Sequence, residues 1–166
     1  MKTLLIISII LFVLYLALLF KIDRSPESIS DSFYIFNKHR RGLGHIFTLW
    51  CFAIMFLVLP QMLEASDGRW FQFLSLFTTA GLGFVGAAPY FKEYEKTIHT
   101  VAAILCASGC FLWVTLMGYA LIPIVLVSIV LIWFIFKVLR GRIPDDVVLW
   151  LELAMFLSMF TTLSLI

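Results

Sequence analysis

Residues 99–136 read HTVAAILCASGCFLWVTLMGYALIPIVLVSIVLIWFIF, and this stretch decides the fold. Its 38 residues contain no Asp, Glu, Lys or Arg. As one α-helix the stretch would be roughly 57 Å long, about twice the ~30 Å hydrocarbon core of a bilayer. It must therefore turn back, and Gly118-Tyr119, with Pro123 shortly after it, is the natural break. This predicts two membrane-crossing helices, over 99–117 and 120–136.

The rest of the chain is just as apolar. Of its 166 residues, 63% are hydrophobic and 13% are charged, and the mean hydropathy is +1.06. Soluble domains have about 45–50% apolar and about 25% charged residues. A soluble chain of this length could not hide so much apolar side chain from water. The composition excludes a soluble enzyme, a disordered chain and a disulfide scaffold. The net charge of +2 is too small to indicate nucleic acid as a partner.

Further apolar stretches complete a predicted set of six spans. The spans are 3–20, 45–63, 70–88, 99–117, 120–136 and 147–166. The last is entered through Pro144-Asp145-Asp146, whose acids suit a helix N-terminus. The first has no small-residue cleavage site before Lys21, so we expect a retained helix. The sequence therefore predicts one all-α domain over residues 1–166, a polytopic integral membrane bundle of six transmembrane helices.

The Lys and Arg residues are divided unequally between the two sides of this predicted bundle. The loops after the first, third and fifth spans hold 10 of the 12, and the other side holds Lys2 and Arg69. Because Lys and Arg are retained on the cytoplasmic side, we expect these three loops in the cytoplasm and both termini outside, in a plasma (inner) membrane. The charges flanking the first span are nearly balanced and weakly favour the opposite orientation.

The first loop carries signals for a short helix of its own. Ser25-Pro26 and the pattern Ser28-x-x-Asp31 are typical of helix starts, and apolar residues then recur at positions 29, 33 and 36. This pattern predicts an interfacial helix with a basic end near anionic lipid head groups. Loop orientation alone would explain the same basic residues. They are Lys38, Arg40 and Arg41.

Small residues recur every four positions in the third and fourth spans. Because helices in lipid associate through close packing of small residues, we expect these two spans to pack tightly against each other. The fifth span has no such stripe and is expected to face lipid. The predicted packing residues are Ser75, Thr79, Gly83 and Ala87 on one helix and Ala102 and Cys106 on the other.

The sequence Gly81-Leu-Gly83-Phe-Val-Gly86 also matches the dinucleotide fingerprint G-x-G-x-x-G. That fingerprint requires a preceding strand within a βαβ unit. Here the motif ends an apolar span that Pro89 closes. We therefore expect no nucleotide partner, and we assign the glycines to helix packing.

Three ionisable side chains lie at membrane depth. His45 begins the second span, His99 begins the fourth, and Glu152 lies five residues into the sixth. Because these spans run in the same direction, the three groups lie on one side of the bilayer at similar depth. Glu95 precedes His99 by four residues and could orient its ring. We expect His45, His99, Glu152 and Glu95 to form a pocket that binds a lipid head group, a small amphiphile or a partner helix.

Other functions remain open for the same residues. Two imidazoles and a carboxylate can hold Zn²⁺, which would make the chain a metal-dependent membrane enzyme acting on lipid. Two His on different helices can also ligate one haem. A small channel or transporter subunit is a third alternative. The main prediction is a non-catalytic protein without cofactor or metal. Its expected partners are membrane lipids, with a partner membrane protein or a homo-oligomer as alternatives.

Short segments of the chain resemble a known family. Gly-Leu-Gly-Phe-Val-Gly-Ala-Ala-Pro (81–89), followed by Lys-Thr-Ile-His-Thr-Val-Ala-Ala (96–103), is similar to the DRAM/Frag/Sfk group of six-helix membrane proteins. Ser-Ile-Ser-Asp-Ser (28–32) resembles an Ile-Ser-Asp stretch of that group. The resemblance implies a six-helix fold and a non-enzymatic role in membrane or lipid organisation. It also implies cytoplasmic termini, opposite to the orientation that the charges favour.

Overall fold

The structure, a computed structural model, describes residues 2–166, which are mostly helical. The long helices are α1 (Lys2–Ile22), α3 (His45–Ala65), α4 (Phe73–Ala87), α5 (Glu95–Val114), α6 (Leu121–Leu139) and α7 (Val147–Leu165). Shorter elements are α2 (Ser32–His39), the 3₁₀ segment η1 (Ala88–Tyr94) and the π-type turn η2 (Thr115–Tyr119). Residues 2–166 contain no strand, so the predicted all-α class is confirmed.

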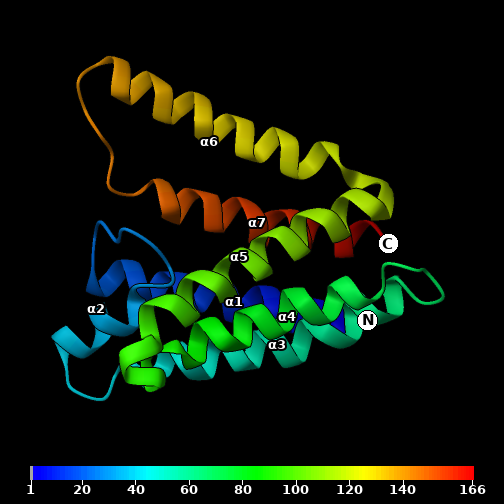
Figure 1. Cartoon of the computed structure of the whole chain (residues 1–166), viewed down its shortest axis with the longest axis horizontal. Coiled ribbons are helices and arrows are strands. Elements are labelled where there is room, and N and C mark those ends of the chain that lie inside the picture. The colour runs from blue at the N-terminus through cyan, green and yellow to red at the C-terminus, as the bar shows by residue number, and fades with distance from the viewer. Residues whose placement is uncertain (1) are drawn as a thin grey trace.

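The long helices form a bundle in which consecutive helices alternate in direction (Figure 1). α4 lies between α3 and α5, and α1 packs against α3 and α7. α6 stands at the outside and contacts mainly α7. Only Pro123 and Val130 of α6 are buried. Most of its apolar side chains are exposed on the outer surface, and the others are half-buried.

Five stretches of the described chain are long and apolar enough to cross a membrane. They are Lys2–Ile22, His45–Ala65, Phe73–Tyr119, Leu121–Leu139 and Val147–Leu165. The third is 47 residues long and folds back at Lys92, whose φ of 48° interrupts the helix. It thus forms the hairpin of α4 and α5. The next turn lies at Gly118, where the sequence predicts it, with the φ of 95° that glycine adopts readily.

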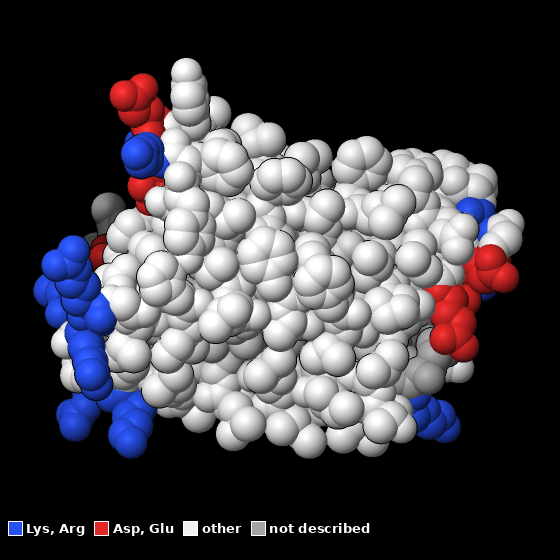
Figure 2. Space-filling model, turned by 90° about the horizontal axis from the view of Figure 1, so that it is seen from below, with Lys and Arg blue, Asp and Glu red and all other residues white. Residues whose placement is uncertain are grey.

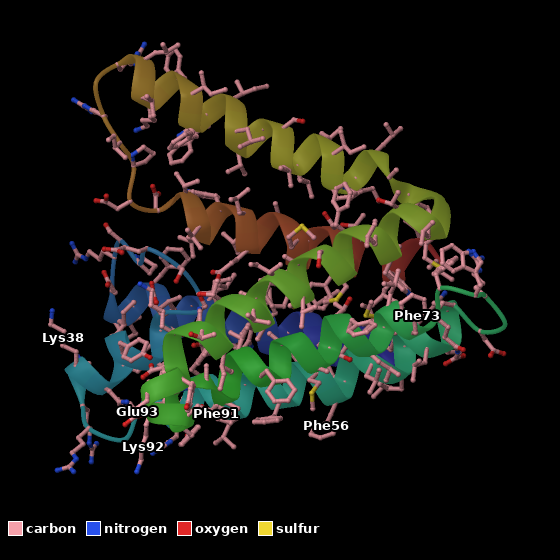
Figure 3. All side chains as sticks on the ribbon, viewed as in Figure 1. Lys38, Phe56, Phe73, Phe91, Lys92 and Glu93 are labelled. Carbon is pink, nitrogen blue, oxygen red and sulfur yellow. The ribbon has the colours of Figure 1, made fainter. Side chains whose placement is uncertain are left out.

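Charged side chains lie at the two ends of the bundle and leave an uncharged belt between them (Figure 2). Lys38, Lys92 and Glu93 lie at the end that carries α2, whereas Phe56 and Phe73 project from other parts of the bundle (Figure 3). Phe56 is 66% exposed although it is apolar. Exposed apolar side chains between two charged ends are the arrangement that a bilayer requires. The structure therefore fits an integral membrane protein.

α2 differs from the predicted interfacial helix. The Ser28 hydroxyl accepts a hydrogen bond from the Asp31 N–H (2.9 Å), but the helix begins only at Ser32. Phe36 is fully buried, and its ring lies 5.8 Å from that of Tyr15 on α1. The apolar side of α2 thus packs on α1 and α3, and the position of this helix at a lipid interface stays a prediction. The basic residues at its end are exposed; they are Lys38, Arg40 and Arg41.

α4 and α5 approach closely, but not through all the predicted residues. A Cβ added to Gly81 would lie 2.7 Å from the backbone N of Cys106 and 2.9 Å from the carbonyl O of Ala102. A Cβ on Gly83 would instead lie 2.7 Å from Sδ of Met55, on α3. Placing Gly83 at the α4–α5 contact was wrong, because two residues along a helix turn a side chain to the opposite face. Small residues of α4 therefore lie at its contacts with both α3 and α5.

The other predicted packing residues of α4 are also divided. The Ser75 hydroxyl lies 3.4 Å from that of Ser66, just after α3, and so faces α3 rather than α5. Thr79 hydrogen-bonds to the Ser75 carbonyl of its own helix (2.7 Å). Ala87 is half-buried at the end of α4. α4 therefore fits between its neighbours because small side chains occur on more than one of its faces.

Candidate ligand-binding cavity

A cavity of about 310 Å³ lies within the bundle, between α3, α4, α5 and α7. On α7 its lining runs from Val148 to Met159, which is about 16 Å of helix. The cavity is therefore elongated along the bundle. Its volume is at the lower end of the range for small-molecule sites, about 300–1,000 Å³. Most of its lining is apolar, including Ile54, Leu82, Ala103 and Met155.

Glu152 is the only Asp, Glu, Lys, Arg or His within residues 2–166 that lines this cavity. One of its carboxylate oxygens accepts a hydrogen bond from the backbone N–H of Ile29 (2.5 Å). The side chain and the amide of Ser30 lie next to the same carboxylate. Ile29 and Ser30 line the cavity as well. The cavity thus has a polar group at its α2 end and apolar walls beyond it.

The loop between α1 and α2 is folded into the end of the bundle, and this positions Ile29. Pro26 is fully buried and Ser28 is 2% exposed. The Glu27 carbonyl accepts a hydrogen bond from the N–H of Leu149 (3.0 Å), one of the first-turn donors that α7 cannot satisfy itself. The loop therefore binds the start of α7 through two contacts, one to backbone and one to the Glu152 side chain.

An aromatic cluster forms one wall of the cavity. The Trp50 ring stacks on Tyr15, with centroids 4.2 Å apart and an interplanar angle of 15°. On its other side lies Phe156 of α7, at 5.7 Å. The Tyr15 hydroxyl is in turn hydrogen-bonded to that of Ser32. Trp50 is thus packed between α1 and α7, and α2 holds the Tyr15 ring through Ser32.

The cavity opens sideways, between α5 and α7. The two helices touch where the Cys110 thiol lies 3.7 Å from the Met155 carbonyl O, and they diverge towards the α2 end (Figure 1). Ile104 and Val148 both line the cavity, yet they are 61% and 52% exposed. Ile104 lies near the middle of α5, within the uncharged belt, and Val148 lies in the first turn of α7, where that belt begins. The opening therefore faces the region that a bilayer would fill with acyl chains.

The two histidines predicted to join Glu152 have other surroundings. His45 Nδ1 lies 2.5 Å from the Tyr90 hydroxyl, and the two rings stack with centroids 5.8 Å apart. His99 is half-buried in α5, which begins at Glu95 rather than at residue 99. Glu95 has a buried carboxylate oxygen without a hydrogen-bond partner. Of the four predicted pocket residues, only Glu152 lines the cavity.

The side chains that could ligate a metal ion do not form a cluster among the described residues. Within residues 2–166, no three His, Cys, Asp or Glu side chains lie close enough to share one. Tetrahedral zinc needs at least three protein ligands at bonding distance. The shared depth of His45, His99 and Glu152 therefore does not amount to a metal centre.

Sequence reasoning missed several residues of this cavity. The most important is Ile29, which contributes a backbone N–H and so leaves no side-chain pattern to detect. Trp50 and Phe156 read as ordinary apolar residues of their spans. A signal was present for the loop, because a serine-rich stretch without charge between positions 28 and 30 is unusual for an exposed cytoplasmic loop.

Comparisons with protein-family models, with curated proteins and with solved structures found no match to this chain. The resemblance to the DRAM/Frag/Sfk group therefore stays a prediction from short motifs.

Proposed function

We propose that the chain is a non-catalytic integral membrane protein whose cavity binds one amphiphilic molecule from the bilayer. The apolar part of the ligand lies among the side chains of α3, α4, α5 and α7, and its polar group meets Glu152. The observation that carries this proposal is a cavity open to the lipid belt with a single carboxylate at its polar end. A site for a water-soluble ligand would need more polar groups and an opening to water.

Occupancy of the cavity by one molecule can be tested directly. The protein is purified from membranes in a mild detergent and examined by native mass spectrometry. We expect one bound amphiphile per chain, lost in Ala103→Phe, which fills the cavity. Val101→Phe is the matched control, because Val101 lies on the same helix, is 52% exposed and does not line the cavity. Equal occupancy in both variants would contradict the proposal.

The topology that supports this site has six crossings, with α4 and α5 each crossing once. α4 has 15 residues, about 22 Å of helix, and η1 extends its path. Phe73 at the start of α4 and Lys92 in η1 lie at different ends of the bundle (Figure 3). The α2 end then faces the cytoplasm, because it carries most of the Lys and Arg residues.

This orientation is testable with a membrane-impermeant maleimide on intact cells. We expect Asp67→Cys, between α3 and α4, to be labelled from outside and Arg142→Cys, between α6 and α7, to be protected until the cells are opened. The native thiols are a low background, since Cys51 and Cys110 are buried and Cys106 is half-buried. The reverse pattern would favour the cytoplasmic termini implied by the family resemblance.

A further inference from the structure

The polar end of the cavity offers hydrogen-bond acceptors but no cation. A carboxylate has about four lone-pair sites. On Glu152 the Ile29 N–H occupies one, and the amide and hydroxyl of Ser30 donate to the same carboxylate. The Ser30 hydroxyl also hydrogen-bonds to that of Ser28 (3.1 Å), so it is engaged with groups of the protein. No Lys, Arg or His of residues 2–166 lines the cavity. A ligand group that donates a hydrogen bond therefore finds an acceptor at Glu152, whereas an anionic group finds no cation and meets a carboxylate.

The basic residues at the same end of the bundle do not supply the cation that the cavity lacks. Lys38, in the last turn of α2, and Arg40 and Arg41, just after it, are exposed, and none of the three lines the cavity. Solvent and salt screen such charges strongly. A phosphate head group can contact these basic residues on the protein surface. A phosphate whose chain fills the cavity would instead lie against Glu152.

We infer that the cavity selects amphiphiles whose polar group donates hydrogen bonds and carries no negative charge, such as a long-chain alcohol, a monoacylglycerol or a long-chain amine. This inference rests on the proposed function and narrows its ligand class. A second negative charge against a buried carboxylate is strongly unfavourable. A hydroxyl or ammonium group can instead donate to a lone pair of Glu152 that Ile29 and Ser30 leave open, and a charged pair makes the stronger hydrogen bond.

The test uses three probes that share one dibrominated C18 chain and differ only in the head group: an alcohol, an amine and a phosphate monoester. Bromine quenches tryptophan fluorescence on contact, and Trp50 lines the cavity. Each probe is titrated into the full chain in nanodiscs of unbrominated phospholipid. The signal from the cavity is the quenching that Trp50→Phe removes. We expect the alcohol and the amine to quench Trp50 and the phosphate to bind at least about tenfold more weakly.

Glu152→Gln identifies the source of the selection. Glutamine keeps an oxygen that accepts from the Ile29 N–H but removes the negative charge. We expect this variant to bind the alcohol as the native protein does. Its discrimination against the phosphate should fall to within about threefold. If Glu152→Gln retained the full discrimination, Glu152 would not be the selecting group and the inference would be wrong.

The outcomes distinguish a failure of the head-group selection from a failure of the proposed binding in the cavity. If the phosphate probe quenched Trp50 as strongly as the alcohol, the selection would be refuted while binding in the cavity stood. If none of the three probes quenched Trp50, the proposed function itself would fail. Should Glu152→Gln not fold, the comparison of the three probes on the native chain still decides the question.

Discussion

The contact between α4 and α5 supports the cavity and permits a sharp test with two glycines of one helix. A Cβ on Gly81 would lie 2.7 Å from the backbone N of Cys106. Ordinary van der Waals contact begins at 3.4 Å, so Gly81→Ala requires the two backbones to separate by about 0.7 Å. A Cβ on Gly83 would be equally close to Met55, but to its Sδ near the end of a flexible side chain. Met55 can move, whereas the α5 backbone cannot move without the rest of its helix.

The two substitutions should therefore differ in stability although they add the same methyl group. Overpacking of this kind typically costs about 1–3 kcal/mol, and we expect Gly81→Ala to fall in that range. Gly83→Ala should change the free energy of unfolding by less than about 1 kcal/mol, since the alanine also gains helix propensity. For a chain of this size each kcal/mol corresponds to about 2–4 °C in Tm.

The assay is thermal unfolding in detergent, followed by intrinsic tryptophan fluorescence. Gly81→Ala should melt at least about 2 °C below the native chain, and Gly83→Ala should melt close to it. Equal melting temperatures for the two variants, or a lower one for Gly83→Ala, would refute the assignment of Gly81 to the α4–α5 contact.

Three further substitutions test the loop and the turns. Glu152→Leu leaves the Ile29 N–H without its partner and should cost about 1–3 kcal/mol; thermal unfolding measures this, and a melting temperature equal to that of Glu152→Gln would argue against the hydrogen bond. Tyr15→Phe removes the hydroxyl bound to Ser32 and should cost about 0.5–1.5 kcal/mol, whereas an unchanged unfolding curve would mean that this bond contributes nothing. Gly118→Ala places a side chain at a φ of 95° and should lower stability by about 1–2 kcal/mol; a stability equal to the native value would show that this turn adopts another conformation.

The sequence predicts most of the architecture because the membrane imposes strong rules on composition. The long uncharged stretches, the turn at Gly118 and the charged ends all follow from hydropathy and helix length. Which neighbouring helix each small residue of α4 contacts could not be predicted in this way. Gly81 and Gly83 are the same residue type in one stripe of small residues, and only the positions of α3 and α5 decide which glycine meets which helix.

The candidate site was harder to predict than the fold. Glu152 was recognisable because a carboxylate inside a span is unusual. Its partner was not, because Ile29 lies 123 residues earlier in the chain and contributes only its backbone N–H. The shared depth of the two histidines was an unreliable guide, since depth alone does not determine direction around a helix. His45 points to Tyr90 instead.

The most direct test of the account is to locate a bound chain by its bromine atoms. Crystals grown in a lipid mesophase with the dibrominated alcohol would show the bromines by anomalous scattering. The account predicts peaks inside the bundle, between Trp50 and Cys106, with the hydroxyl within hydrogen-bonding distance of Glu152. Bromine peaks confined to the outer surface of the helices, with the cavity unoccupied by the probe, would contradict it.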